Sequence, residues 1–213
     1  MRKVKSGPRA AFFELISQRS LKNLGACSRT IRSFVTSTLL MADPARVSAV
    51  TARAVEMTAG SDLAAFSQIG HGGYRITGTK TADISVETAD GISLHAGNGA
   101  GEAAYAQIGH GGYQSGGALS GDISTFASSV ITLQAGEGLH HYAQIGHGGT
   151  SAGGSRSGSI EVAGIAGIEL HGGTGDETTA RIGHGGIGAS GSADGAVQVA
   201  SAAHLLLGSG DRD

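Results

Sequence analysis

The chain has 213 residues, of which 38 are glycine, nine are phenylalanine or tyrosine and none is tryptophan. This composition excludes a globular domain with a large mixed core, because large side chains contribute most of the area that such a core buries. Charge divides the chain, since residues 1–53 carry a net charge of +8 and residues 54–213 carry −10. The acidic part is a poor candidate for nucleic-acid binding, because phosphate contacts need Lys or Arg.

The basic N-terminal segment, residues 1–44, differs from the rest, and we expect it to be a helical cap or disordered. Pro8–Leu24 has apolar residues at helical spacing, and Ser28 is a suitable cap for a second helix that contains Ile31. Three interpretations stay open: a cap over the first repeat, a targeting sequence, or upstream sequence without a folded role. No apolar run approaches 18 residues, so we expect no membrane span.

A repeat array follows over residues 45–213. One pentapeptide, Ile-Gly-His-Gly-Gly, occurs four times at spacings of 39, 37 and 37 residues, which is the signature of a repeat architecture. The array stops at Asp213 in mid-repeat, so we expect it to be truncated or to stack on a partner. The four copies are Ile69–Gly73, Ile108–Gly112, Ile145–Gly149 and Ile182–Gly186.

Two short alternating runs precede each pentapeptide and are typical of β-strands. Apolar and β-branched residues alternate with polar ones in both runs, and a turn signal lies between them at 89–91. The two extra residues of the longer unit fall near 98–101, where a glycine-rich loop is expected. The side chains predicted to face inward in one unit are Ile84, Val86, Ile92 and Leu94.

Short strands, glycine-rich corners and a fixed period predict an all-β protein, a parallel β-helix (β-solenoid) built from repeats of about 37 residues. A coil of the full repeat encloses more volume than Ala, Gly and Ile fill at interior packing density. We therefore favour two coils of roughly 18 residues per repeat, which gives about nine coils and a rod of roughly 43 Å. One large coil per repeat and a propeller with one repeat per blade are the alternatives.

The repeat also resembles a known family. Tyr-Ala-Gln-Ile-Gly-His-Gly-Gly, followed by Ser-Gly-Asp-Ile-Ser and a Gly-Ile-x-Leu-x-Ala-Gly stretch, is similar to the repeat regions of large bacterial surface proteins of the filamentous haemagglutinin type. The resemblance implies a right-handed parallel β-helix in an exported adhesin or filament at the cell surface or outside the cell. It implies as partners host or neighbouring-cell surface molecules, or further repeats of the same protein.

The histidines of the pentapeptide raise a metal hypothesis. With two coils per repeat the imidazoles stand about 9–10 Å apart, whereas a shared metal needs ring nitrogens near 2.1 Å from the ion. We therefore predict no metal and no cofactor, and expect each imidazole to bond a backbone carbonyl at a corner. With one coil per repeat the rings stack at about 4.8 Å and a ligand ladder becomes possible. The metal candidates under that alternative are His71, His110, His147 and His184.

Other repeated side chains have simpler interpretations. His95 and His171 share an outward slot with Gln134, and the adjacent His140 and His141 lie in a loop as a weak candidate for a surface metal site. A repeated aromatic slot indicates a stacking ladder that fixes register, with an exposed glycan-binding ladder as the alternative. The residues of that slot are Phe66, Tyr105 and Tyr142.

Enzyme motifs fail. His-Gly-Gly resembles an oxyanion-hole turn, but four periodic copies do not make one active site, and Gly154–Gly158 has Arg where a Gly-x-Ser-x-Gly motif needs its nucleophile. We expect a non-enzymatic structural or adhesive repeat segment, without catalytic or cofactor-binding residues. The alternative is a ligand-binding rod that uses the histidine or aromatic ladders for metal or glycan.

Overall fold

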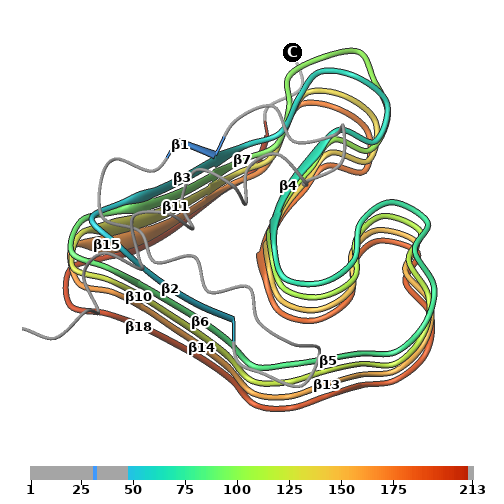
Figure 1. Cartoon of the computed structure of the whole chain (residues 1–213). Helices are drawn as coiled ribbons and strands as arrows, with labels where there is room; N and C mark the ends of the chain where they lie inside the picture. The colour runs from blue at the N-terminus through green and yellow to red at the C-terminus, as the bar shows by residue number, and fades with distance from the viewer. Residues whose placement is uncertain (1–30, 33–47, 211–213) are drawn as a thin grey trace, which may run out of the picture.

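The computed structural model describes residues 31–32 and 48–210, and this part of the chain is a parallel β-solenoid (Figure 1). Four strands recur in the same order in every coil, and each pairs in parallel with its equivalents in the neighbouring coils. The prediction of an all-β parallel β-helix is therefore confirmed. Parallel pairing also excludes the propeller, whose blades are antiparallel.

Four sheets run along the solenoid, and we number them in the order in which one coil visits them. Sheet I contains β2 (Ser48–Ala52), β6 (Ile84–Thr88), β10 (Ile123–Ala127), β14 (Ile160–Gly164) and β18 (Val197–Ser201). Sheet II contains β3 (Val55–Thr58), β7 (Ile92–His95), β11 (Val130–Gln134), β15 (Gly167–His171) and β19 (Leu205–Gly208). Sheet III contains β4 (Phe66–Ile69), β8 (Tyr105–Ile108), β12 (Tyr142–Ile145) and β16 (Thr179–Ile182). Sheet IV contains β5 (Lys80–Thr81), β9 (Leu119–Ser120), β13 (Arg156–Ser157) and β17 (Ala193–Asp194).

Each repeat forms one coil, so the prediction of two coils per repeat is wrong. Ile131 of β11 pairs with Ile92 of one neighbouring coil and with Ile168 of the other. Coils 1 to 4 are thus β2–β5, β6–β9, β10–β13 and β14–β17, and β18 and β19 begin a fifth. With about 4.8 Å between paired strands, this stack is roughly 20–25 Å long, about half the expected 43 Å.

The shape of the cross-section explains why a 37-residue coil is filled by small residues. Figure 1 shows the chain leave sheet II for a lobe, fold back along sheet III, pass round an arm to sheet IV and return to sheet I. The coil is deeply indented, so its interior is much smaller than that of a round tube with the same perimeter. The enclosed volume expected for a 37-residue coil was therefore too large, because that expectation applies to a round outline.

Sheets I, II and III enclose the main apolar core. The four side chains predicted to face inward are all buried in it, and their columns continue in the next coil with the buried residues Ile123, Thr125, Ile131 and Leu133. The loop from 96 to 104 is two residues longer than its equivalent from 135 to 141, which confirms where the extra residues fall. The four are Ile84, Val86, Ile92 and Leu94.

Little of the N-terminal segment is described. Residues Ile31–Arg32 form β1, an antiparallel strand on the outer edge of β3, so the helix predicted to contain Ile31 is wrong at this position. An edge strand placed there agrees with a cap over the first coil. The predicted helix over 8–24 lies outside the described residues, and the boundary at residue 44 stays a prediction. No helix in the described ranges is long and apolar enough to span a membrane.

Candidate functional site

The pentapeptide carries the chain from sheet III into the arm, and its glycines are required by the neighbouring coil. A Cβ built on Gly109 would lie well inside the 3.0 Å that real Cβ atoms keep from other atoms, because the carbonyl of Gly146 faces it from the next coil. Gly111 has a φ of 101°, a conformation that side chains other than glycine adopt at a cost. The pentapeptide is therefore a backbone turn built for close stacking.

The histidines of the pentapeptide form a continuous ladder. Ring centroids of His71, His110, His147 and His184 are 4.9, 4.9 and 5.1 Å apart along the stack, with the planes tilted by 12° or less. The separation of 9–10 Å expected from two coils per repeat is thus wrong. The rings are close enough that their hydrogen bonds, rather than their spacing, decide whether a metal fits.

Both nitrogens of each interior imidazole are occupied. The backbone N–H of His71 donates to Nδ1 of His110 over 3.0 Å, and Nε2 of His110 lies 2.8 Å from the carbonyl oxygen of Ala82. Because Nδ1 accepts, Nε2 carries the proton and donates to that carbonyl. His147 repeats the arrangement with the N–H of His110 and the carbonyl of Gly121. The predicted bond to a backbone carbonyl is confirmed for these two rings and for His184, whose Nε2 lies 2.9 Å from the carbonyl oxygen of Gly158.

Burial keeps these two imidazoles neutral. Desolvation lowers the pKa of His110 and of His147 to about 4, although the bonds to the carbonyls of Ala82 and Gly121 act in the opposite direction. A metal ion would need the lone pair on Nδ1, which already accepts a backbone N–H. The described part of the chain also contains no group of three His, Cys, Asp or Glu side chains placed to hold a metal.

A glutamine clamp lies beside the histidine ladder. Nε2 of Gln107 donates to the carbonyl oxygens of Gly146 (2.8 Å) and Gly148 (2.6 Å) in the next coil. Gln68 and Gln144 make the same pair of bonds with the glycines of the coils that follow them. Sequence reasoning missed this role, although the repetition of Gln before the pentapeptide was its signal. The equivalent residue of coil 4 is Arg181.

The aromatic slot is an interior stacking ladder. Phe66 and Tyr105 stack with centroids 5.1 Å apart, and Tyr105 and Tyr142 with centroids 4.7 Å apart. Tyr105 is 0% exposed and Tyr142 is 1% exposed, so neither ring offers a face to a sugar. The prediction of a stacking ladder is confirmed, its role in fixing the register stays a prediction, and the glycan-binding alternative does not fit these buried rings.

The remaining histidines divide between surface and interior. His95, Gln134 and His171 share one outward column on sheet II, as predicted. His141 is buried, with its two ring nitrogens against the carbonyls of Gly97 and Gly101, so a surface site that includes it is wrong.

His140, next to it, lies between the carboxylates of Glu102 (3.0 Å) and Glu177 (2.8 Å). A hydrogen bond from Tyr113 holds the pKa of Glu102 below its usual value, and a hydrogen bond from His140 adds a smaller contribution in the same direction. This cluster bridges three successive coils along the lobe and is partly exposed.

Two buried cations in the arm gave no sequence signal, because their ladder position holds Lys, Leu, Arg and Ala in successive coils. Lys80 Nζ donates to the carbonyl of Gly78, and Arg156 donates from Nη2 to the carbonyls of Ser190 and Gly191. Burial lowers the pKa of both groups. Their partners among the described residues are backbone carbonyls. Lys80 therefore links residues within one coil, and Arg156 links its coil to the next.

Comparison with protein-family models, with curated proteins and with solved structures finds no match to this chain.

Proposed function

We propose that this chain is a structural β-solenoid segment of a bacterial surface or secreted protein, and that it acts through its length and its sides. The observation that carries the proposal is how the repeated polar groups are used. The amide nitrogen of Gln107 and both ring nitrogens of His110 and His147 form hydrogen bonds to backbone groups, most of them in a neighbouring coil. Because these polar groups bond neighbouring coils to each other, they support a rod-like structure and are not available to bind a ligand.

The finer part of the proposal concerns place and partners. The resemblance of the repeat to filamentous haemagglutinin-type proteins supports an exported filament or adhesin that contacts host or neighbouring-cell surface molecules. The outer faces of sheets I and II are the surfaces available for such contacts, and the exposed residues of sheet I include Glu87, Ser124 and Glu161. The absence of enzymatic activity stays a prediction.

Neither of the two ladders considered for ligand binding is available to a ligand. The interior imidazoles have no free nitrogen, and the interior tyrosines have no exposed face. A rod that bound metal or glycan would need other residues.

Force measurement on single molecules tests the structural role. In a chain held by its two ends, coils unravel one at a time, because each coil contacts only its neighbours. A repeat of 37 residues releases about 130 Å of extended chain, so steps of that size at a clearly measurable force are the expected result. Extension at the force of an unfolded chain, without steps, would contradict the proposal.

A further inference from the structure

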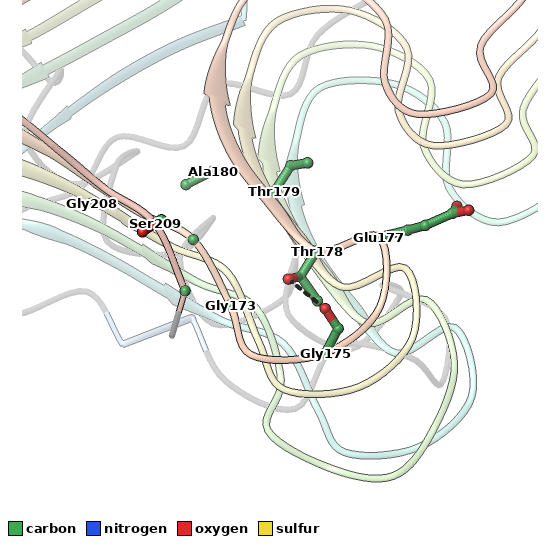
Figure 2. A pocket seen from close by; sticks show the side chains of 10 residues that line it. Gly173, Gly175, Glu177, Thr178, Thr179, Ala180, Gly208 and Ser209 are labelled. Carbon is green, nitrogen blue, oxygen red and sulfur yellow. Dashed lines mark hydrogen bonds between the residues drawn. The ribbon is translucent and has the colours of Figure 1, made fainter. Parts of the chain in front are cut away.

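A network of side chains ties the lobe to the start of the arm. Tyr113, which follows the second pentapeptide, donates its hydroxyl proton to Glu102 Oε1 in the lobe over 2.6 Å. In the lobe of the next coil, His140 has Nδ1 3.0 Å from that oxygen and Nε2 2.8 Å from Glu177 Oε2, which belongs to the coil after that. Figure 2 shows the side chain of Glu177 extending from its turn in the direction opposite to Gly208. The network therefore joins three coils to each other and to the arm.

These residues are not part of the repeat. The position of Glu102 holds Leu63 in the coil before and Leu139 in the coil after. The position of His140 holds Ala103 in the coil before. Coil 1 stacks on coil 2 without a polar side chain at either position, so stacking alone does not account for the network. It is a local feature of coils 2 to 4.

The ring of His140 has acceptors at both nitrogens. A carboxylate lies at each one, and the hydroxyl oxygen of Tyr113, whose proton is already donated to Glu102, lies 3.3 Å from Nδ1. A neutral imidazole has one donor and one acceptor, so it cannot bond to both carboxylates, whereas the imidazolium has two donors. Arg75, on the arm side, is a cation that also acts on Glu102. The closed network therefore requires a proton on each nitrogen of the ring.

The lobe turn is strained where the network holds it. His140 and Glu177 have φ values of 60° and 54°, in the left-handed region that side chains other than glycine adopt at a cost. Leu139 is 42% exposed and Gly138 precedes it, so little apolar burial offsets this cost. The backbone N–H of His140 donates to the carbonyl of Asp176 in the next turn. The side-chain bonds of His140 thus act where the chain has few apolar contacts to hold it.

The lobe and the arm together cover the aromatic ladder. Ala103 from the lobe and Tyr113 from the arm pack with Tyr105 and Tyr142 of sheet III in one buried cluster. Figure 1 shows the lobe and the arm at opposite ends of sheet III. Separation of the lobe from the arm would therefore uncover these rings.

We infer that His140 is a pH-sensitive latch, which holds the lobes of coils 2 to 4 together and against the arm when its ring is protonated. As the pH rises, the ring loses one proton, and a lone pair then faces a carboxylate in place of a hydrogen bond. The latch is closed in mild acid and opens toward pH 8, within the range in which histidine changes charge. This inference goes beyond the structural role, because it gives the folded solenoid two states.

Hydrogen–deuterium exchange of the full chain at pH 6 and pH 8 tests the latch. The protection factors of residues 96–104 and 135–141, which already allow for the pH dependence of intrinsic exchange, should fall about tenfold at pH 8 through loss of one charge-assisted hydrogen bond. Those of 130–134 in sheet II should stay the same. The ladder does not contribute, because burial lowers the pKa of His110 and His147 to about 4 and both are neutral at either pH.

Tyrosine fluorescence gives a second measurement of the same opening. The chain has no tryptophan, and its four tyrosines all lie in or against the covered cluster. Acrylamide should therefore quench the fluorescence more strongly at pH 8 than at pH 6. The four are Tyr74, Tyr105, Tyr113 and Tyr142.

Two variants separate the latch from other effects of pH. His140→Gln should show the low protection at both pH values, because a neutral amide cannot donate to both carboxylates in this geometry. Glu177→Gln should keep the high protection at pH 8, within about twofold of its value at pH 6, because its amide can donate to the neutral ring. Glu161→Gln, on the outer face of sheet I, is the matched control and should behave like the unaltered chain.

Three outcomes would overturn the inference. One is equal protection of the lobe at pH 6 and pH 8 in the unaltered chain. The second is a pH dependence that His140→Gln retains, since another group would then control the lobe. The third is a Glu177→Gln variant that opens at pH 8 as the unaltered chain does. If circular dichroism shows that His140→Gln does not fold, the comparison of the unaltered chain with Glu177→Gln decides alone.

Discussion

The two sides of each coil follow different rules. On the apolar side, the column that runs through Leu133 also contains Met57, Leu94, Leu170 and Leu207, and the neighbouring columns exchange Val, Ile and Leu. On the pentapeptide side, all four copies are identical at five positions. One side therefore tolerates changes of side chain that the other does not.

The two sides differ because each requires a different property of its residues. The apolar columns need volume and hydrophobicity, which several side chains supply. The pentapeptide needs backbone room at Gly109 and Gly111 and a ring with one donor and one acceptor at His110, which few residues supply. Five changes test this difference between the two sides, and they are given in order of decreasing expected effect.

Gly109→Val should have the largest effect, with a loss of folding free energy on the order of 4 kcal/mol or more, because the new side chain meets the Gly146 backbone. Gly183→Val is the matched control, since its side chain meets nothing within 4 Å and only the backbone conformation is strained. Urea denaturation followed by circular dichroism measures both. Equal losses for the two variants would show that stacking of the pentapeptides does not set the glycine requirement.

Leu133→Ala should cost about 2–5 kcal/mol, because it opens a cavity in a column that is fully buried. Leu133→Met should cost less than about 1.5 kcal/mol, since Met57 already stands in this column and the volume is nearly kept. The same denaturation measurement compares them. A Met variant as damaged as the Ala variant would mean that the apolar side is as specific as the pentapeptide side.

Acid should destabilise the chain through the histidine ladder. Burial lowers the pKa of His110 and His147 to about 4 in the folded chain, below the usual imidazole value of 6.5, so the folded state binds fewer protons between these values. Their stabilising contribution is complete above pH 6.5 and is lost as the pH falls toward 4, by up to about 3 kcal/mol for each ring. Urea midpoints measured from pH 7.5 to pH 4 test this loss.

His110→Gln separates the ladder from other acid effects. The variant should be less stable at pH 7 by about 1–3 kcal/mol, because glutamine does not reproduce both bonds, yet it should lose less stability on acidification. It should also lose less than Gly109→Val. An unchanged acid slope in this variant would contradict the assignment of a neutral, buried His110.

Tyr142→Phe should have the smallest effect, within about 0.5 kcal/mol, since Tyr142 Oη is buried and has no hydrogen-bond partner within the described part of the chain. Phe66 fills the same slot in coil 1 and stacks equally well. A change in thermal midpoint of only a few degrees is expected. A large loss would reveal a bond of the hydroxyl group that the ring ladder depends on.

The sequence predicted the fold class and the inward face of the strands because both depend on local alternation and on the repeat. Ile84 and Leu94 are inside for reasons visible within ten residues of each. The number of coils per repeat was not predictable in this way. It depends on how the lobe and the arm fold back on sheet III, which is set by contacts between residues far apart, such as His110 with Ala82.

The candidate site was predicted in part. The aromatic stacking ladder was predicted because its residues recur with the repeat, whereas a histidine ladder was expected only under the alternative of one coil per repeat. The partners of each ring were not predicted, because a hydrogen bond from one coil to the next leaves no mark in the spacing. Lys80 and Arg156 were invisible for a different reason, since their buried position holds a different residue type in each coil.

A disulfide between neighbouring coils tests the central claim, that one repeat makes one coil. Ser124 and Glu161 are exposed and pair directly across β10 and β14, so cysteines there, in a chain with Cys27→Ser, lie about 4.8 Å apart. That spacing is within disulfide range. The same pair should form a bridge under mild oxidation, seen by mass spectrometry, whereas cysteines at Ser85 and Glu161, two coils apart, should not. No bridge between 124 and 161 in the folded chain would contradict the account.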